Sequence, residues 1–291
     1  MDPTVIFLGD RFLDTAEAAR VSLFDRGYLL GDSVFETLRA YHAVAFRLRA
    51  HLGRLKHSAE VVGIRIPRKS EEIAKVVQEG LRRSGLTDAY VRVTVSRGEG
   101  PGGIGTAGYN QPLLSVLVRP LHPYPPEAYL HGIRSRVVQV RKVPGACLDP
   151  TIKCGNYLPN ILARRELEAK GMIEGVQLSI DGKVTGGTVS NVFLVNGSRL
   201  RTPDLASGIL PGITRRALIE VAPTAGLEVV EEQIDVADLY QAEELFFANT
   251  LMECLPVGEI DGRQLAPAPG PRTRALQAAF GDLVNRETGA C

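Results

Sequence analysis

The sequence predicts an α+β fold with two domains, and three observations support this prediction. The chain has 291 residues, enough for two cores or for one large mixed unit. Segments with strand-like alternation are interspersed with segments of helical periodicity. Prolines cluster between residues 120 and 126 and interrupt this pattern. We therefore expect a small N-terminal α/β domain over residues 1–120, a linker over 121–126 and a larger C-terminal α/β domain over 127–291.

The N-terminal part combines strands with two helices. Apolar side chains at alternating spacings of four and three, from Leu48 through Leu55 to Val62, form one face of an amphipathic helix. We expect Ser70 to be the N-cap of the next helix. Alternating apolar residues predict strands over Val5–Leu8, Ser33–Tyr41, Ala89–Ser96 and Leu113–Val118.

The C-terminal part also mixes the two kinds of element. One helix is expected over Tyr157–Lys170, because Gly171 is a residue type that ends helices. Another opens at Pro211-Gly212 and runs past Val221, and Pro271 starts the last helix. Strands are expected over Ile133–Val140, Gly175–Ile180, Asn191–Val195, Glu244–Ala248 and Cys254–Ile260.

Composition narrows the range of functions. Hydrophobic residues make up 44% and charged residues 23%, which is typical of a globular protein. The formal charge of +1, from 34 basic and 33 acidic residues, favours neither nucleic acid nor an anionic membrane as a partner. No apolar run approaches the roughly 20 residues of a membrane span, and we see no secretory signal. Cys147, Cys154, Cys254 and Cys291 form no CxxC pair, so we expect reduced thiols in a cytoplasmic protein.

Two apparent motifs, one for dinucleotide binding and one for metal binding, lack the sequence context that these functions require. Gly98–Gly103 matches GxGxxG after a strand, but neither a helix start nor a βαβ unit follows. A mobile glycine loop over a ligand is therefore favoured over dinucleotide binding. His51 and His57 lie six residues apart on the expected helix, whereas two metal ligands on one helix face lie four apart. Solvated or partly packed histidines are the favoured interpretation, and no metal site is expected.

Three other features suggest chemistry, although each also has an ordinary structural explanation. Pro211–Arg215 opens a helix with exposed N–H groups and a hydroxyl, which suits an anion or is simply a capped helix. Arg54 flanks the apolar helix face, from which it can bind a phosphate or extend to water. Lys153 lies where a strand or loop meets a helix. Most lysines are solvated, but a protected one can form a Schiff base.

The order of these features resembles one family, the fold-type-IV pyridoxal-phosphate (PLP) enzymes. This family includes branched-chain and D-amino-acid aminotransferases, R-selective amine transaminases and aminodeoxychorismate lyases. The resemblance is collinear and covers nearly the whole chain, so it implies the two-domain fold of that family. Its five blocks are Asp25–Thr37 with Phe46–Leu55, Lys153–Leu158, Val184–Phe193, Leu210–Arg215 and Asn249–Met252.

The resemblance implies a role for residues of every block. Lys153 would form the Schiff base with PLP and then move a proton as general base and acid. Arg54 and the Thr250 hydroxyl would contact the cofactor phosphate, and Tyr157 would lie near the phenolic oxygen. Further cofactor contacts are expected from Gly186, Ser190, Asn191, Leu210, Ile213 and Thr214, and substrate contacts from Tyr28, Phe35, Tyr90, Arg92 and Leu251.

Two positions depart from the family pattern. The family usually has a glutamate where this chain has Gly186, and that glutamate keeps the pyridine nitrogen protonated, which strengthens the ring as an electron sink. Glycine cannot do this. Either a water or another side chain substitutes, or the ring stays neutral and transamination is slow. Gly102 stands where many relatives have an arginine, so one carboxylate-binding group is in doubt.

The resemblance leaves three functions open. The first is a PLP-dependent aminotransferase that moves an amino group between a small amino acid or amine and a 2-oxo acid. The second is aminodeoxychorismate lyase, which releases pyruvate and 4-aminobenzoate, and towards which Phe35-Glu36-Thr37 and Asn249–Met252 lean. The third is a PLP-binding protein with weak or no catalysis, for which Gly186 is the only support. Family members are generally homodimers, so the resemblance also implies a homodimer.

Overall fold

Two compact units make up the computed structural model, which describes residues 3–265 and 267–289. The chain first passes from one unit to the other at His122 and Pro123, inside the expected linker. The expected division into two consecutive domains differs from the observed one, because two later segments return to the first unit. Unit 1 contains Met1–His122, Ile152–Asn156 and Val284–Cys291, and unit 2 contains Pro123–Thr151 and Tyr157–Leu283.

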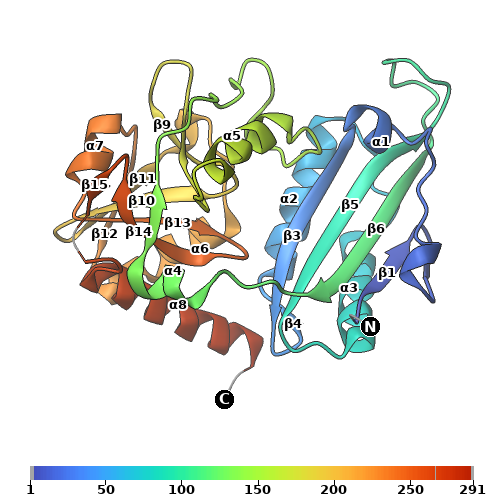
Figure 1. Cartoon of the computed structure of the whole chain (residues 1–291). Helices are drawn as coiled ribbons and strands as arrows, with labels where there is room; N and C mark the ends of the chain where they lie inside the picture. Colours follow the sequence, from blue (N-terminus) through green and yellow to red (C-terminus); the bar gives the residue numbers. More distant parts are fainter. Residues whose placement is uncertain (1–2, 266, 290–291) are drawn as a thin grey trace. The chain divides into compact units, whose positions relative to one another are not determined.

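Unit 1 is built on a six-stranded sheet (Figure 1). Its strands are β1 (Val5–Leu8), β2 (Arg11–Phe12), β3 (Ser33–Tyr41), β4 (Val44–Ala45), β5 (Ala89–Glu99) and β6 (Gln111–Pro120). They lie in the order β2-β1-β6-β5-β3-β4, and every neighbouring pair is antiparallel. The four expected strands are confirmed, and two of them, β5 and β6, extend beyond the predicted ends.

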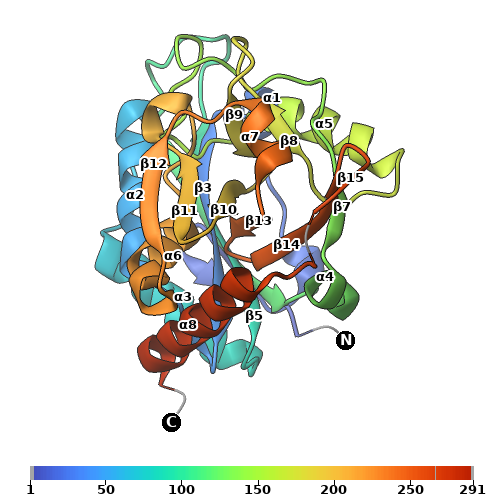
Figure 2. The same ribbon diagram turned by 90° about the vertical axis from the view of Figure 1, so that its left-hand side faces the viewer.

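Two long helices, α2 (Leu48–Val61) and α3 (Ser70–Ser84), pack on this sheet (Figures 1 and 2). The apolar face of α2 is buried, as the spacing of its leucines predicts. Ser70 is the first residue of α3 and not its N-cap, because Lys69 precedes it with extended backbone and donates its N–H to Glu72. Two short helices come earlier in the chain, η1 (Ala16–Ala18) and α1 (Arg26–Leu30).

Unit 2 contains a seven-stranded sheet and a separate two-stranded sheet. The large sheet has the order β12-β11-β10-β13-β14-β15, with β7 paired to β14, and the small one pairs β8 with β9. The strands are β7 (Ile133–Ser135), β8 (Val176–Leu178), β9 (Val184–Gly187), β10 (Asn191–Asn196), β11 (Arg199–Pro203), β12 (Glu228–Glu232), β13 (Glu244–Asn249), β14 (Glu253–Ile260) and β15 (Arg263–Gln264).

The helices of unit 2 follow the sequence expectation at their starts. The three expected helices are α5 (Leu158–Glu168), α6 (Ile213–Val221) and α8 (Pro271–Thr288), of which α8 belongs to unit 2 only up to Leu283. The shorter ones are α4 (Pro126–His131), η2 (Leu205–Ser207), η3 (Ala222–Ala225) and α7 (Val236–Gln241). In the described ranges, no helix has both the length and the apolar composition needed to cross a bilayer.

Several strands of unit 2 differ from the prediction. β7 has only three residues, whereas a strand over Ile133–Val140 was expected. After Ser135 the chain leaves β14, and Val137 forms a single bridge with Val176 of β8. β11 and β12 were missed because both carry charged residues and depend on parallel pairing with each other across 24 intervening residues, 204–227.

Two aromatic side chains stack on each other in the large sheet of unit 2. Phe193 of β10 and Phe246 of β13 are Cα partners, and their rings are stacked with centroids 5.0 Å apart. Both side chains are fully buried. Aromatic pairs of this kind contribute both buried area and a specific geometry. The pair therefore fixes the register of two strands that lead into the turns described below.

We predict that Phe193→Ala lowers the free energy of unfolding by about 3–5 kcal/mol, because it leaves a cavity in the sheet core. Urea denaturation followed by circular dichroism measures this loss. The matched control is Leu205→Ala, at a side chain that is 51% exposed, for which a change within about 0.5 kcal/mol is expected. Equal effects of the two substitutions would contradict this account of the core.

Candidate active site

Lys153 belongs to unit 1, where the short segment Ile152–Asn156 runs beside the start of β3. The main-chain N–H of Phe35 donates to the carbonyl oxygen of Lys153 at 2.9 Å. The N–H of Lys153 donates to the Ser58 hydroxyl of α2 at 3.0 Å. Cys154 forms a bridge with Val34. Both β3 and α2 therefore fix the main chain at this lysine, which the sequence placed only at the junction of a loop and a helix.

The Phe35 ring brings together three of the predicted site residues. The ammonium nitrogen of Lys153 lies 4.6 Å from the ring centroid, and the guanidinium carbon of Arg92 lies 3.7 Å from it. Arg92 also donates from Nε to the Thr94 hydroxyl at 3.1 Å. Cations within about 6 Å of an aromatic ring are attracted to its face. The charged groups of Lys153 and Arg92 therefore both lie against the Phe35 ring.

A buried carboxylate stands next to Phe35 in the sequence. Glu36 accepts two hydrogen bonds from Arg54, from Nε at 2.7 Å and from Nη2 at 2.8 Å. It also contacts Nδ1 of His51 at 2.7 Å. We call these three residues the Glu36 cluster. Glu36 is fully buried and His51 is 1% exposed, so the expectation of a solvated or partly packed His51 is wrong, while His57 is exposed.

The charges of the Glu36 cluster compensate each other. Burial raises the pKa of Glu36, but the hydrogen bonds from Arg54 and His51 outweigh burial and lower that pKa to about 2. Burial lowers the pKa of His51, and the positive charges of Arg54 and Lys153 lower it further, against the hydrogen bond to Glu36. At neutral pH the cluster therefore holds one carboxylate, one guanidinium and a neutral imidazole that donates from Nδ1.

One sequence signal could have revealed this cluster. Side chains of a strand alternate between its two faces, so Glu36 shares a face with Val34 and Leu38. Those two apolar side chains are fully buried. A carboxylate in such a position requires cationic or hydrogen-bonding partners, because an unpaired buried charge is very costly. Nothing in the local pattern, however, tells which arginine supplies the charge.

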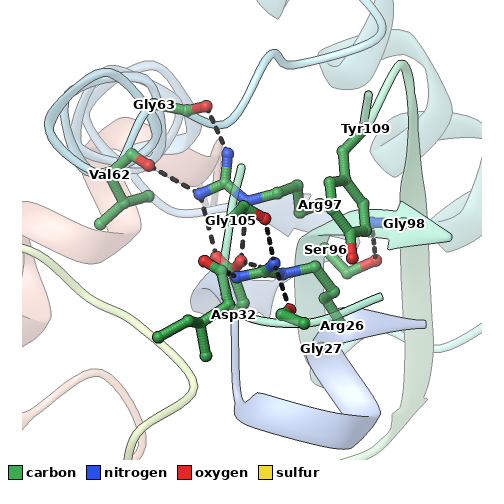
Figure 3. A network of polar contacts seen from close by, with 12 residues as sticks. Arg26, Gly27, Asp32, Val62, Gly63, Ser96, Arg97, Gly98, Gly105 and Tyr109 are labelled. Carbon is green, nitrogen blue, oxygen red and sulfur yellow. Dashed lines mark hydrogen bonds and ion pairs between the residues drawn. The ribbon is translucent and has the colours of Figure 1, made fainter. Parts of the chain in front are cut away.

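The glycine-rich loop between β5 and β6, residues 100–110, is tied to α1 by Arg26 (Figure 3). Arg26 donates to the carbonyl oxygens of Gly103 at 3.1 Å and Gly105 at 2.6 Å. Asp32 bridges Arg26 and Arg97, with Oδ2 lying 2.7 Å from Nε of each arginine. The loop closes a hairpin and does not open a helix, which agrees with the rejection of dinucleotide binding.

Tyr90 and Tyr28 are the other two expected substrate contacts of unit 1. The Tyr90 ring packs under the guanidinium of Arg119, whose carbon lies 4.6 Å from the ring centroid. Tyr28 lies on α1 and is 69% exposed. Gly102, in the glycine-rich loop, faces open space, so nothing in the fold prevents a side chain there beyond its positive φ of 92°. Tyr90 and Arg92 are two residues apart on β5, so their side chains lie on the same, half-buried face of that strand.

In unit 2 a second buried carboxylate organises the turn between β9 and β10. Glu174 is fully buried and accepts from the N–H and the hydroxyl of Thr188, at 2.7 and 2.6 Å, and from the Ser190 hydroxyl at 3.1 Å. Asn160 of α5 donates to the Thr188 carbonyl oxygen. Sequence reasoning missed Glu174, because its partners lie 14 to 16 residues further along the chain. The turn that carries Ser190 is thus fixed by hydrogen bonds to the buried Glu174 carboxylate.

The start of α6 has the features of an anion site. Gly212 is the N-cap and provides no side chain, so the first N–H groups, at Ile213 and Thr214, receive no side-chain cap. A Cβ atom at Gly212 would lie 2.1 Å from Oδ1 of Asn191, so only glycine fits there. Asn191 donates to the Leu210 carbonyl oxygen at 3.2 Å, which ties two of the expected blocks together. N–H groups and the helix dipole at such a start favour a phosphate.

The remaining block of unit 2 is held to the same turn by one asparagine. Asn249 donates to the Val189 carbonyl oxygen at 3.2 Å. Its Oδ1 accepts from the N–H groups of Leu251 and Met252 at 2.8 and 2.9 Å. Thr250 and Leu251 therefore sit in a turn whose position depends on the turn after β9. Tyr157 is the N-cap of α5 and half-buried.

At Gly186, where the family usually has a glutamate, the main-chain conformation also disfavours a side chain. Its φ is 149°, which side chains rarely adopt, and a Cβ atom would lie 2.8 Å from the Ser190 carbonyl oxygen. The residues present thus fit a phosphorylated aldehyde cofactor in two respects, with an amine at Lys153 and an uncapped helix start at Ile213. No carboxylate can be provided from position 186.

Comparison with known proteins decides the family. The family model described as "Amino-transferase class IV" matches residues 33–260 of this chain. A protein named putative branched-chain-amino-acid aminotransferase, from Methanocaldococcus jannaschii, is 41% identical over 279 residues, which is 96% of each chain. The chain belongs to the class IV aminotransferase family. Its α+β fold and the identification of the family from five blocks are confirmed.

Three further similarities bear on activity within this class IV family. The aminodeoxychorismate lyase of Bacillus subtilis is 31% identical over 279 residues, covering 95% of this chain and 93% of that protein. The solved structure of the Escherichia coli branched-chain amino acid aminotransferase matches with a TM-score of 0.92 and 31% identity, covering 98% of this chain and 95% of the other. Another matching structure of a branched-chain amino acid aminotransferase was solved with pyridoxamine 5'-phosphate.

We predict that Glu36→Gln lowers the free energy of unfolding by about 3–5 kcal/mol, because it leaves the buried Arg54 charge without its carboxylate. Urea denaturation at neutral pH measures the loss. Glu60→Gln, at a side chain of α2 that is 65% exposed, is the control and should change the value by less than about 0.5 kcal/mol. A Glu36→Gln protein as stable as the parent would show that the cluster contributes little.

Acid should destabilise the protein in two steps. The pKa of His51 is lowered by burial from 6.5, so below pH 6.5 the unfolded chain binds a proton that the folded one refuses. The pKa of Glu36 falls from 4.5 to about 2 on folding, so its stabilisation is complete above pH 4.5 and is lost as the pH falls towards 2. Urea midpoints measured across this range should fall with pH, and the lower step should shrink in Glu36→Gln. Flat midpoints would contradict the assigned protonation states.

Proposed function

We propose that this protein is a PLP-dependent aminotransferase that moves an amino group between a small amino acid and a 2-oxo acid. The observation that carries the proposal is the placement of Lys153. Its main chain is fixed by Phe35 and Ser58, and its amine lies beside the Phe35 ring. Names of relatives make branched-chain amino acids the first donors to test.

When bound, PLP supplies an electron-withdrawing ring for the carbon that loses its proton. In this proposal the Lys153 amine would hold the cofactor, and its Nζ would move a proton as general base and acid. The N–H groups of Ile213 and Thr214 and the Thr250 hydroxyl bind the phosphate, together with Arg54. Glu36 orients the Arg54 guanidinium, because two of its nitrogen atoms are bonded to that carboxylate.

Other predicted residues have supporting roles. Arg92 offers a guanidinium for the substrate carboxylate, and it lies against the same Phe35 ring as the Lys153 amine. Further contacts are proposed from Tyr157 at the phenolic oxygen, from Leu210, Ser190 and Asn191 around the ring, and from Tyr28, Tyr90 and Leu251 at the substrate.

We also propose that the enzyme is a cytoplasmic homodimer. Unit 1 exposes Leu23, Phe24 and Tyr28 by 67%, 72% and 69%, and exposed apolar groups of this kind are typical of association surfaces. Three cysteines of the described ranges, Cys147, Cys154 and Cys254, carry no disulfide, which suits a reducing compartment. Cys291 lies outside the described residues.

The test of the proposed function is the absorption spectrum of the purified protein with PLP, followed by addition of single amino donors. L-Branched-chain amino acids come first, then other L- and D-amino acids and R-amines. An aminotransferase converts the bound PLP to pyridoxamine phosphate with at least one donor, and a 2-oxo acid reverses the conversion. Bound PLP that no donor changes would overturn the proposal and leave two functions, the lyase and a PLP-binding protein without catalysis.

A second function, aminodeoxychorismate lyase, is favoured by one relative of that name. The two activities differ in their products. A lyase releases pyruvate and an aromatic amine from aminodeoxychorismate and leaves no pyridoxamine phosphate behind. Pyruvate formation from that substrate, without any amino donor that converts the cofactor, would select the lyase over the aminotransferase.

We predict that Lys153→Ala abolishes the visible band of the lysine-bound cofactor and lowers turnover by about 10²- to 10⁴-fold, because the general base is lost. Spectroscopy and a coupled transamination assay measure the two effects. Lys56→Ala is the control, since this lysine of α2 is 65% exposed. Parent-like spectrum and turnover in Lys153→Ala would show that another residue holds the cofactor.

A further inference from the structure

Gln177 stands where the missing side chain of Gly186 would be expected. Gln177 is the central residue of β8, and its Cα atom pairs with that of Gly186 on β9. Paired residues of antiparallel strands carry their side chains on the same face. Gly186 has no side chain, so on this face of the two-stranded sheet the pair presents a single polar group, the amide of Gln177.

The amide of Gln177 is buried and incompletely paired. The residue is 1% exposed. Its Nε2 donates to the Val140 carbonyl oxygen at 3.5 Å, which is at the outer limit of a hydrogen bond. Its Oε1 is buried and has no donor within reach among residues 3–265 and 267–289. Most buried polar atoms of side chains do have a partner, so an unpaired oxygen here calls for a specific explanation.

The neighbouring polar groups are already engaged. Glu174 is the buried carboxylate next to this sheet, and it accepts from Gly175, Thr188 and Ser190. The Thr185 hydroxyl donates to the main-chain oxygen of Gln177 at 2.9 Å. A glutamate cannot simply be restored at position 186, because its Cβ atom would collide with the Ser190 carbonyl oxygen. The Gln177 amide is therefore the group best suited to meet a ring nitrogen at this face.

We propose that the side-chain amide of Gln177 contacts the pyridine nitrogen of the cofactor, in the place of a carboxylate. The inference rests on the proposed function, since it requires that PLP binds. A protonated ring nitrogen at this face would supply the donor that the Oε1 atom of Gln177 lacks. A neutral amide stabilises the pyridinium charge less than a carboxylate does. The ring nitrogen should therefore lose its proton more easily than one that faces a glutamate.

The experiment follows the ring nitrogen directly. The full-length protein is loaded with PLP that carries nitrogen-15 in the ring, and its NMR shift is recorded against pH, because protonated and unprotonated pyridine nitrogens differ widely in shift. In Gln177→Glu the titration midpoint of the ring nitrogen should be at least about 1 pH unit higher than in the parent protein. This shift corresponds to a tenfold change in the protonation constant. In Gln177→Leu the midpoint should fall below that of the parent.

The matched control is Gln277→Glu. Gln277 is another partly buried glutamine of unit 2, bonded to the Cys254 carbonyl oxygen at 3.0 Å and belonging to α8. Its substitution introduces the same charge away from β8 and β9 and should leave the midpoint unchanged. Circular dichroism verifies that each variant is folded. If Gln177→Glu does not fold, Gln177→Leu alone decides the question.

The outcomes separate this inference from the proposed function. Bound label with the same midpoint in the parent, Gln177→Glu and Gln177→Leu overturns the role of Gln177 and leaves the aminotransferase proposal intact. A shift of equal size in Gln277→Glu also overturns it, because the effect would then be one of general charge. Failure of the parent protein to bind the label through Lys153 overturns the proposed function, and this inference with it.

Discussion

The ion pair between Glu36 and Arg54 is the constraint on which the rest of unit 1 depends. A carboxylate at a core position of β3 is tolerable only with a cation and a hydrogen-bond donor, and α2 provides both within one turn, as Arg54 and His51. These contacts fix α2 against β3. Lys153 is in turn bonded to both elements, through Ser58 and Phe35. Breaking the pair would therefore disturb the lysine as well as the helix.

Unit 2 also contains a buried carboxylate, Glu174, which fixes a turn. The Glu174 carboxylate has hydroxyl and N–H donors and fixes the turn after β9. Asn249 and Asn191 extend this order to the blocks at 249–252 and 210–215. The result is a glycine-capped helix start whose N–H groups are held in position. In both units a buried carboxylate serves to orient other groups and is not itself offered to a ligand.

The parts of the fold that follow from periodicity were predictable from the sequence. The apolar spacing of α2 and the alternation in β3 gave the correct elements, because burial against one neighbour produces both patterns. β11 and β12 were not predictable in this way, since their pairing links segments far apart in the chain. The lysine block and the α6 start were recognisable by their order alone. Glu174 and Gln177 were not, because their importance arises from residues further along the chain, the turn after β9 for Glu174 and Gly186 for Gln177.

The central claim is that Lys153 carries the cofactor. Reduction of the PLP-loaded protein with borohydride converts the Schiff base to a stable secondary amine, and peptide mass spectrometry then identifies the modified residue. The account predicts a single phosphopyridoxyl group on the peptide that contains Lys153. A group on a different lysine, or no modified peptide from the folded protein, would contradict it.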